Sequence, residues 1–154
     1  MLREKAKEIP AEEIKSKKFQ NIIKKMKKVI AENNDALAVA APQIGESWQI
    51  TVISEWTLNP VSETPKTEFK NMVFINPKII KASRDKKLFP EGCLSAPDQF
   101  GEVKRAEKVK VEAYNEKGEK FTRGASGLLA QTLQHEIDHL NGILFIDKAT
   151  NLTK

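Results

Sequence analysis

The chain contains two histidines, and they stand four residues apart in His135-Glu136-Ile137-Asp138-His139. On a helix, residues at this spacing lie on one face about one turn apart, so both imidazoles can reach a single ion. The glutamate beside the first histidine lies one residue round the helix. There it can touch a water bound to the ion without being a ligand. This arrangement is typical of zinc hydrolases and predicts a metal-dependent hydrolytic site.

A catalytic metal site usually has three protein ligands and leaves a further position open. The chain has a single cysteine, Cys93, in the run Glu91-Gly92-Cys93-Leu94-Ser95, and it is the candidate for the third ligand. A soft thiolate suits zinc or ferrous iron. The alternatives are a buried cysteine that acts as a small apolar side chain and histidines on an exposed helix. A Cys/His/His set also differs from ordinary metalloproteases, whose third ligand is normally Glu, His or Asp.

Composition limits what kind of protein carries this site. The 154 residues are 40% hydrophobic and 31% charged, which excludes both a disordered chain and a membrane-spanning bundle. One cysteine cannot form an internal disulfide. The first ten residues are charged throughout and contain no apolar signal-peptide core, so we expect the cytoplasm, where a lone thiol stays reduced. No membrane partner and no specific DNA partner are expected.

The surrounding pattern predicts one α+β domain over residues 1–154. Apolar residues recur at helical spacing from about Ala11 to Asn33, with a lysine-rich outer face. A second helix, over about Ser126 to Leu140, carries the histidines, and Gly142 fits its left-handed C-terminus. Period-two alternation and turn residues predict strands at 49–53, 72–75, 78–80, 108–114, 120–122 and 143–146, the fourth and fifth of them forming a hairpin, with a loop over 55–70.

In three blocks the sequence resembles the peptide deformylase family. The family's first block, G-x-G-x-A-A-x-Q, is similar to residues 36–43, ALAVAAPQ. Its second block, E-G-C-L-S, stands unchanged at 91–95, and its third, Q-H-E-x-D-H, at 134–139. The resemblance extends from about Leu2 to Asp147. It implies antiparallel β-sheets packed around a central helix that bears the HExxH motif, with an N-terminal amphipathic helix.

The resemblance also implies a reaction: hydrolysis of the N-formyl group from the N-terminal methionine of a nascent polypeptide, releasing formate. By it, Cys93, His135 and His139 bind one divalent ion, which is Fe²⁺ in the family, with Zn²⁺, Ni²⁺ or Co²⁺ as substitutes. Such an ion lowers the pKa of a water toward neutrality. Glu136 is the general base, and the Gln43 amide and the Leu94 backbone N–H donate to the oxyanion. The implied substrate-binding residues are Leu37, Ala38, Phe89, Glu91, Gly92 and Leu128.

Some positions depart from the family pattern. Both glycines of the first block are alanines, Ala36 and Ala38. We hypothesise weaker or narrower activity if a methyl group at Ala38 crowds the peptide, although alanine is tolerated where φ is negative. The chain is expected to lack the long C-terminal helix with which some bacterial relatives dock on the ribosome. The basic face of the first helix could replace it; its lysines are Lys15, Lys17, Lys18, Lys24, Lys25, Lys27 and Lys28.

Two other functions remain open. One is a metallopeptidase or amidase with an altered substrate, built on the same water-activating residues. The other is a degenerate, non-catalytic deformylase homologue that binds nascent chains or ribosomes. For an active deformylase we expect a cytoplasmic location, or an organellar matrix or stroma in a eukaryote, or the host cytoplasm for a viral protein.

Overall fold

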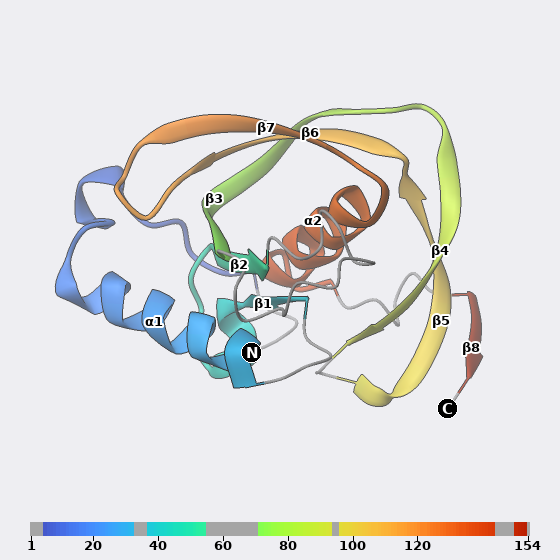
Figure 1. The fold of residues 1–154 in the computed structure, drawn as a ribbon, viewed down its shortest axis with the longest axis horizontal. Coiled ribbons are helices and arrows are strands. Elements are labelled where there is room, and N and C mark those ends of the chain that lie inside the picture. Colours follow the sequence, from blue (N-terminus) through green and yellow to red (C-terminus); the bar gives the residue numbers. More distant parts are fainter. Residues whose placement is uncertain (1–4, 33–36, 55–70, 94–95, 144–149, 154) are drawn as a thin grey trace.

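The structure is a computed structural model that describes residues 5–32, 37–54, 71–93, 96–143 and 150–153. Within the strands at 89–93, 96–101 and 150–153 it describes the backbone alone. Two antiparallel sheets and two α-helices make up the described part of the chain. In Figure 1, the second helix lies in the middle of the molecule, below an arch of strands, and the first helix lies at the lower left.

The larger sheet has five antiparallel strands in the order β1-β2-β3-β6-β7. Their bounds are β1 Ala38–Ala40, β2 Ile50–Ser54, β3 Asn71–Ala82, β6 Lys108–Tyr114 and β7 Lys120–Ser126. Alternate residues of β6 are buried, namely Val109, Val111 and Ala113, while Lys108 and Lys110 are exposed and Glu112 is half-buried. This alternation is what a sheet with one covered face requires, and it confirms the hairpin predicted over 108–122.

The smaller sheet has three strands in the order β4-β5-β8. They are β4 Lys86–Cys93, β5 Ala96–Ala106 and β8 Thr150–Thr153. The turn after β3 leads directly into β4, and only Glu107 separates β5 from β6, so the chain passes between the sheets twice. Sequence patterning did not predict these three strands. Proline, glycine and charged residues interrupt the alternation of β4 and β5, and β8 is only four residues long.

The helix α2, Gly127–Leu140, forms the core of the described structure and confirms the helix predicted over 126–140. Eleven of its residues are buried. Leu129, Ala130, Leu133 and Ile137 pack in one cluster with the inner face of the five-stranded sheet, including Phe74. Because most of this helix is buried, its polar side chains need hydrogen-bond partners within the protein, and those partners show how the helix is held.

The helix α1, Lys17–Glu32, covers the other face of the sheet near β1, β2 and β3. Its buried stripe is Phe19, Ile22, Ile23, Met26 and Ile30, as the helical periodicity predicts. The helix begins later than predicted, after a short 3-10 turn, η1, at Ala11–Glu13. The Gln20 side chain donates to the Ile14 and Glu116 carbonyls at 2.9 and 3.0 Å, and these bonds tie the bend before α1 to the β6–β7 turn.

The two strands predicted at 72–75 and 78–80 are one strand, β3, and this prediction was wrong about the break at Asn76-Pro77. Asn76 has a φ of 52° and lies at an irregularity in the pairing with β6. Its side chain accepts from the Ile9 N–H and donates to the Ile9 carbonyl, at 2.9 and 2.8 Å. The N-terminal segment therefore stabilises a kink inside the strand. The loop predicted over 55–70 and all but the first residue of the strand predicted at 143–146 lie outside the described residues.

Candidate metal centre

The end of α2 holds the two histidines. The Asn141 N–H donates to the Ile137 and Asp138 carbonyls, and the Gly142 N–H donates to the His139 carbonyl at 3.0 Å. Gly142 has a φ of 79°, the left-handed conformation predicted for this position. These bonds complete the last helical turn, so His139 sits on ordered backbone rather than on a frayed end.

The two imidazoles converge on one point. Their Nε2 atoms are 3.2 Å apart, and the ring planes meet at 70°. Two nitrogens each bound at the usual distance of about 2.0–2.1 Å to one ion, and separated in this way, would subtend an angle of roughly 100–106°, close to tetrahedral. His135 and His139 are 8% and 1% exposed. The donor set and its spacing therefore fit a single divalent ion.

Glu136 lies beside this pair and is 5% exposed. Its carboxylate and the histidine nitrogens offer candidate ligand atoms that all lie within 4.8 Å of one another. A buried carboxylate this close to the two nitrogens is within reach of a water held at the same point. This position is compatible with the general-base role predicted for Glu136, which stays a prediction.

The position predicted for the third ligand is the last residue of β4. Cys93 pairs with Ala96 of β5, after an irregularity in the pairing that follows Gly92. Phe89, Glu91 and Gly92 precede it on the same strand, paired with Val103, Gly101 and Phe100. The side chains of these four β4 residues, and Leu94 altogether, lie outside the described part of the structure, so their roles stay predictions.

Gln43 lies in a short 3-10 turn, η2, at Ala41–Ile44, and is half-buried. Its Oε1 accepts a hydrogen bond from the Ala40 N–H at 2.8 Å. Because this bond fixes which corner of the carboxamide is the oxygen, the NH₂ group occupies the other corner. That group is the donor that an oxyanion needs.

Three other predicted substrate residues are described. Leu37 precedes β1 and accepts from the Ser54 N–H at 2.9 Å, and Leu128 lies in the first turn of α2; both are half-buried. Ala38 opposes Ile53 of β2 and belongs to the same buried cluster as α2. Its φ is not positive, so alanine causes no backbone strain at this position. Within the described part of the chain, β1 is an edge strand of its sheet.

Sequence reasoning gave no role to two buried polar residues near the histidines. Arg105 of β5 is 3% exposed and forms an ion pair with Asp138. Gln134 is 9% exposed and hydrogen-bonds the Ala106 backbone. Both stand in segments similar to the family, but only the tertiary structure brings them together.

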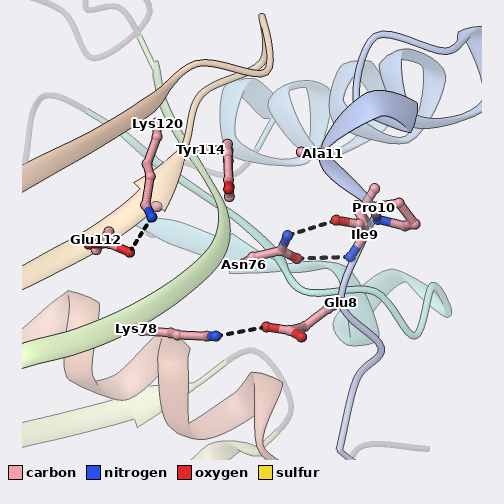
Figure 2. Close-up of a pocket in the computed structure, with 10 residues that line it drawn as sticks. Glu8, Ile9, Pro10, Ala11, Asn76, Lys78, Glu112, Tyr114 and Lys120 are labelled. Atoms are coloured by element: carbon pink, nitrogen blue, oxygen red, sulfur yellow. Dashed lines mark hydrogen bonds and ion pairs between the residues drawn. The ribbon is translucent and has the colours of Figure 1, made fainter.

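A cavity of about 400 Å³ lies elsewhere, between the N-terminal segment and the five-stranded sheet. Figure 2 shows its charged residues already paired, Lys78 with Glu8 and Lys120 with Glu112, each at 3.1 Å. The hydrogen bond and charge of Glu112 raise the pKa of Lys120. Glu112 and Lys120 alternate with Val111 and Phe121, which pack on the α2 side, so this cavity opens on the opposite face of the sheet.

None of the described helices is long and apolar enough to cross a membrane. Several named proteins are similar to this chain. A peptide deformylase of Desulfitobacterium hafniense is 44% identical over 156 residues, an alignment that covers 100% of this chain and 91% of that protein. Peptide deformylase 2 of Clostridium acetobutylicum is 38% identical over 154 residues, covering 100% of this chain and 92% of that protein.

Solved structures agree. A peptide deformylase from Synechococcus elongatus in complex with actinonin superposes with a TM-score of 0.80 at 36% identity, covering 97% of this chain and 74% of that one. A class I type b peptide deformylase from Acinetobacter baumannii superposes with a TM-score of 0.82 at 34% identity, covering 96% of this chain and 91% of that one. The sequence profile described as Polypeptide deformylase matches residues 1–154. With its histidine pair, buried glutamate and sheet arrangement, the chain belongs to the polypeptide deformylase family.

Proposed function

We propose that this chain removes the N-formyl group from the N-terminal methionine of nascent polypeptides, using one divalent ion held by Cys93, His135 and His139. The family assignment makes it a deformylase and a metalloenzyme; the residue roles are the proposal. The observation that carries it is the buried pair of Nε2 atoms, 3.2 Å apart, beside the buried Glu136. For the ion we propose Fe²⁺ in the cell, with Zn²⁺, Ni²⁺ or Co²⁺ as substitutes.

When bound, the ion supplies Lewis-acid activation of a water at neutral pH. Glu136 takes the proton of that water as it attacks the formyl carbon, and then delivers the proton to the departing amine. The Gln43 NH₂ group and the Leu94 N–H donate to the oxygen that becomes negative. The products are formate and a free amino terminus. Because Glu136 is buried, bulk water has little access to it, and its electrostatic interactions are stronger than they would be in water.

The remaining predicted residues would hold the substrate. Leu37, Phe89 and Leu128 are proposed as walls of a methionine pocket, because an unbranched thioether suits an adaptable apolar slot. Ala38, Glu91 and Gly92 are proposed to lie along the peptide. Among the described strands β1 lies at the edge of its sheet, and this supports the proposal because an extended peptide can pair with a strand edge.

The test is formate release from formyl-Met peptides by protein loaded anaerobically with iron, with metal content measured on the same sample. We expect about one ion per chain and formate produced only from formylated peptides. A bound ion without formate would favour the non-catalytic homologue. Cleavage of internal peptide bonds would favour the metallopeptidase.

We also propose that residues 1–154 form one catalytic domain, since the helix with the histidines packs against one sheet and bonds to the other. The similar proteins include bacterial deformylases and one from tomato named as chloroplastic. On that basis we propose a bacterial cytoplasm or an organelle as the location, or the host cytoplasm if the chain is viral.

The lysine-rich face of α1 is proposed as a ribosome contact. The helix carries six lysines and one acidic residue, Glu32. Two of the lysines form ion pairs, Lys27 with Glu116 at 2.9 Å and Lys28 with Glu32 at 3.8 Å. Reversing Lys24, Lys25, Lys27 and Lys28 to glutamate is predicted to reduce salt-sensitive co-sedimentation with ribosomes by at least about tenfold.

The matched control reverses Lys81, Lys86, Lys108 and Lys110, four exposed lysines of β3, β4 and β6. It changes net charge equally and leaves α1 intact. If both variants lose sedimentation alike, net charge is responsible and the α1 surface is not a docking site. If neither loses it, the lysines serve solubility.

Ala38→Gly tests whether the alanine in the first block limits activity. Because φ is not positive and the side chain packs in the α2 cluster, we expect kcat/KM on formyl-Met peptides to stay within about threefold of wild type. The free energy of unfolding should fall by about 0.5–1 kcal/mol, since glycine is more flexible in a strand. A tenfold rise in kcat/KM would instead support crowding of the peptide.

A further inference from the structure

Two adjacent residues of β5 hold α2 at two points one helical turn apart. Arg105 forms an ion pair through Nη1 with the Asp138 carboxylate. The next residue, Ala106, donates its N–H to Gln134 Oε1 at 2.9 Å, and its carbonyl accepts from Gln134 Nε2 at 2.9 Å. Gln134 thus pairs with the Ala106 backbone as a neighbouring strand would. We call these contacts the β5 clamp.

The β5 clamp occupies the helix positions directly before the two histidines. Gln134 precedes His135 and Asp138 precedes His139. Neighbouring residues on a helix are separated by about 100° of rotation, so fixing the first pair of side chains fixes the direction of the second. Two contacts one turn apart set both the rotation of α2 about its axis and its tilt against β5.

The Leu140 carbonyl at the end of α2 also accepts from the Ala6 N–H and from Gln49, but the apolar packing of the helix does not define its rotation as narrowly. Leu129, Leu133 and Ile137 contact the five-stranded sheet through apolar surface, and such contacts have no preferred direction. Hydrogen bonds and ion pairs lose strength steeply when their angle or length changes. Arg105 is 3% exposed, so loss of its carboxylate partner would leave a buried, unpaired charge, which is strongly destabilising.

The clamp also connects the parts of the chain that carry the proposed ligands. β5 pairs along its length with β4, whose last residue is Cys93. The five-stranded sheet contains neither of these strands. The contacts of Arg105 and Ala106 with α2 therefore tie the helix of the two histidines to the sheet of the cysteine.

We propose that Arg105 and Gln134 are positioning residues of the metal centre, which set the rotation of α2 so that both imidazoles face one ion. This inference rests on the proposed ligand set. Residues that orient metal ligands from outside typically change metal affinity by about 10–100-fold when replaced. The β5 clamp should therefore act on metal affinity and ligand geometry, not only on folding.

The experiment uses the full chain, with Co²⁺ as the probe. Affinity is measured by chelator competition, and geometry by the visible absorption of the Co²⁺ protein. Gln134→Met removes both bonds to Ala106 at similar side-chain length, and Arg105→Lys keeps the charge but loses the guanidinium geometry. Each is expected to weaken Co²⁺ binding by at least about tenfold and to change the absorption spectrum. Thr132→Val is the matched control, because it removes a buried α2 hydrogen bond, to the Leu128 carbonyl at 2.8 Å, that does not involve β5.

Wild-type affinity and an unchanged spectrum in a folded Gln134→Met or Arg105→Lys protein would overturn the proposal. So would an equal loss in Thr132→Val, which would mean that any destabilised α2 binds metal poorly. If Gln134→Met does not fold, Arg105→Lys alone decides between these results. Cys93→Ser tests the ligand set itself. Because Cys93 is the chain's one cysteine, the wild-type Co²⁺ protein should show a thiolate-to-cobalt band that Cys93→Ser lacks. If wild type shows no such band and Cys93→Ser binds Co²⁺ as tightly as wild type, the proposed ligand set has failed and the positioning role fails with it.

Discussion

Replacing any one of Cys93, His135 and His139 is expected to abolish both metal binding and deformylase activity. The chain has one cysteine and two histidines, so no spare residue of either type can take over. For Cys93→Ser and His135→Ala we expect the metal content to fall from about one ion per chain to below about a tenth. Activity should fall by at least a similar factor, because the ion activates the water.

Thermal unfolding with and without added Zn²⁺ provides an independent measurement. An ion that binds only the folded state stabilises it by about 4 kcal/mol when present at a thousand times its dissociation constant. The melting temperature of wild type should therefore rise on addition of Zn²⁺, and that of each variant should not. Wild type stripped by a chelator is the control for the loss of the ion alone. A Cys93→Ser protein with full metal content would show that the third ligand lies elsewhere.

The second large effect is expected from Glu136→Gln, which keeps the shape of the side chain and removes its ability to accept a proton. We expect kcat/KM to fall by about 10²–10⁴-fold, the usual contribution of a general acid–base group. Metal content should remain at one ion per chain, because Glu136 is proposed to act on the water and not on the ion. Formate release and metal analysis on the same preparation measure both quantities.

Glu107→Gln is the matched control for that substitution. Glu107 pairs with the exposed Lys87 at 2.9 Å, between β5 and β6, and such surface pairs contribute little to stability. Its activity should equal that of wild type. Loss of the ion from Glu136→Gln would make Glu136 a ligand, and retention of most activity would assign the proton transfer to another group.

Several features could be predicted from the sequence because they depend on local pattern. The 3.6-residue periodicity of α1 and the alternation of β6 reflect the burial of one face, and the structure confirms both. The spacing of His135 and His139 alone placed both rings on one side of a helix. That spacing makes their Nε2 separation of 3.2 Å possible, and the side-chain torsions set it.

Other features depend on partners far away in the chain. β4 and β5 lack clear alternation, and their pairing from Lys86 to Cys93 is decided by the register of the two strands with each other. Asn76 looked like a strand end, yet the bonds from its side chain to Ile9, 67 residues away, keep β3 continuous. The local propensities of the residues carry no information about such long-range contacts.

The metal-site prediction came from residue types and spacing: two histidines and a glutamate at helical spacing, one cysteine, and the family blocks around them. How these residues are buried and oriented could be read from the folded chain alone. In the fold Glu136 and His139 are buried, and a hydrogen bond from the Ala40 N–H orients the Gln43 carboxamide. Arg105 and Ala106 of β5 contact α2. The reason is physical, since spacing along a helix fixes the direction of neighbouring side chains, whereas burial and orientation depend on which distant strand packs against them.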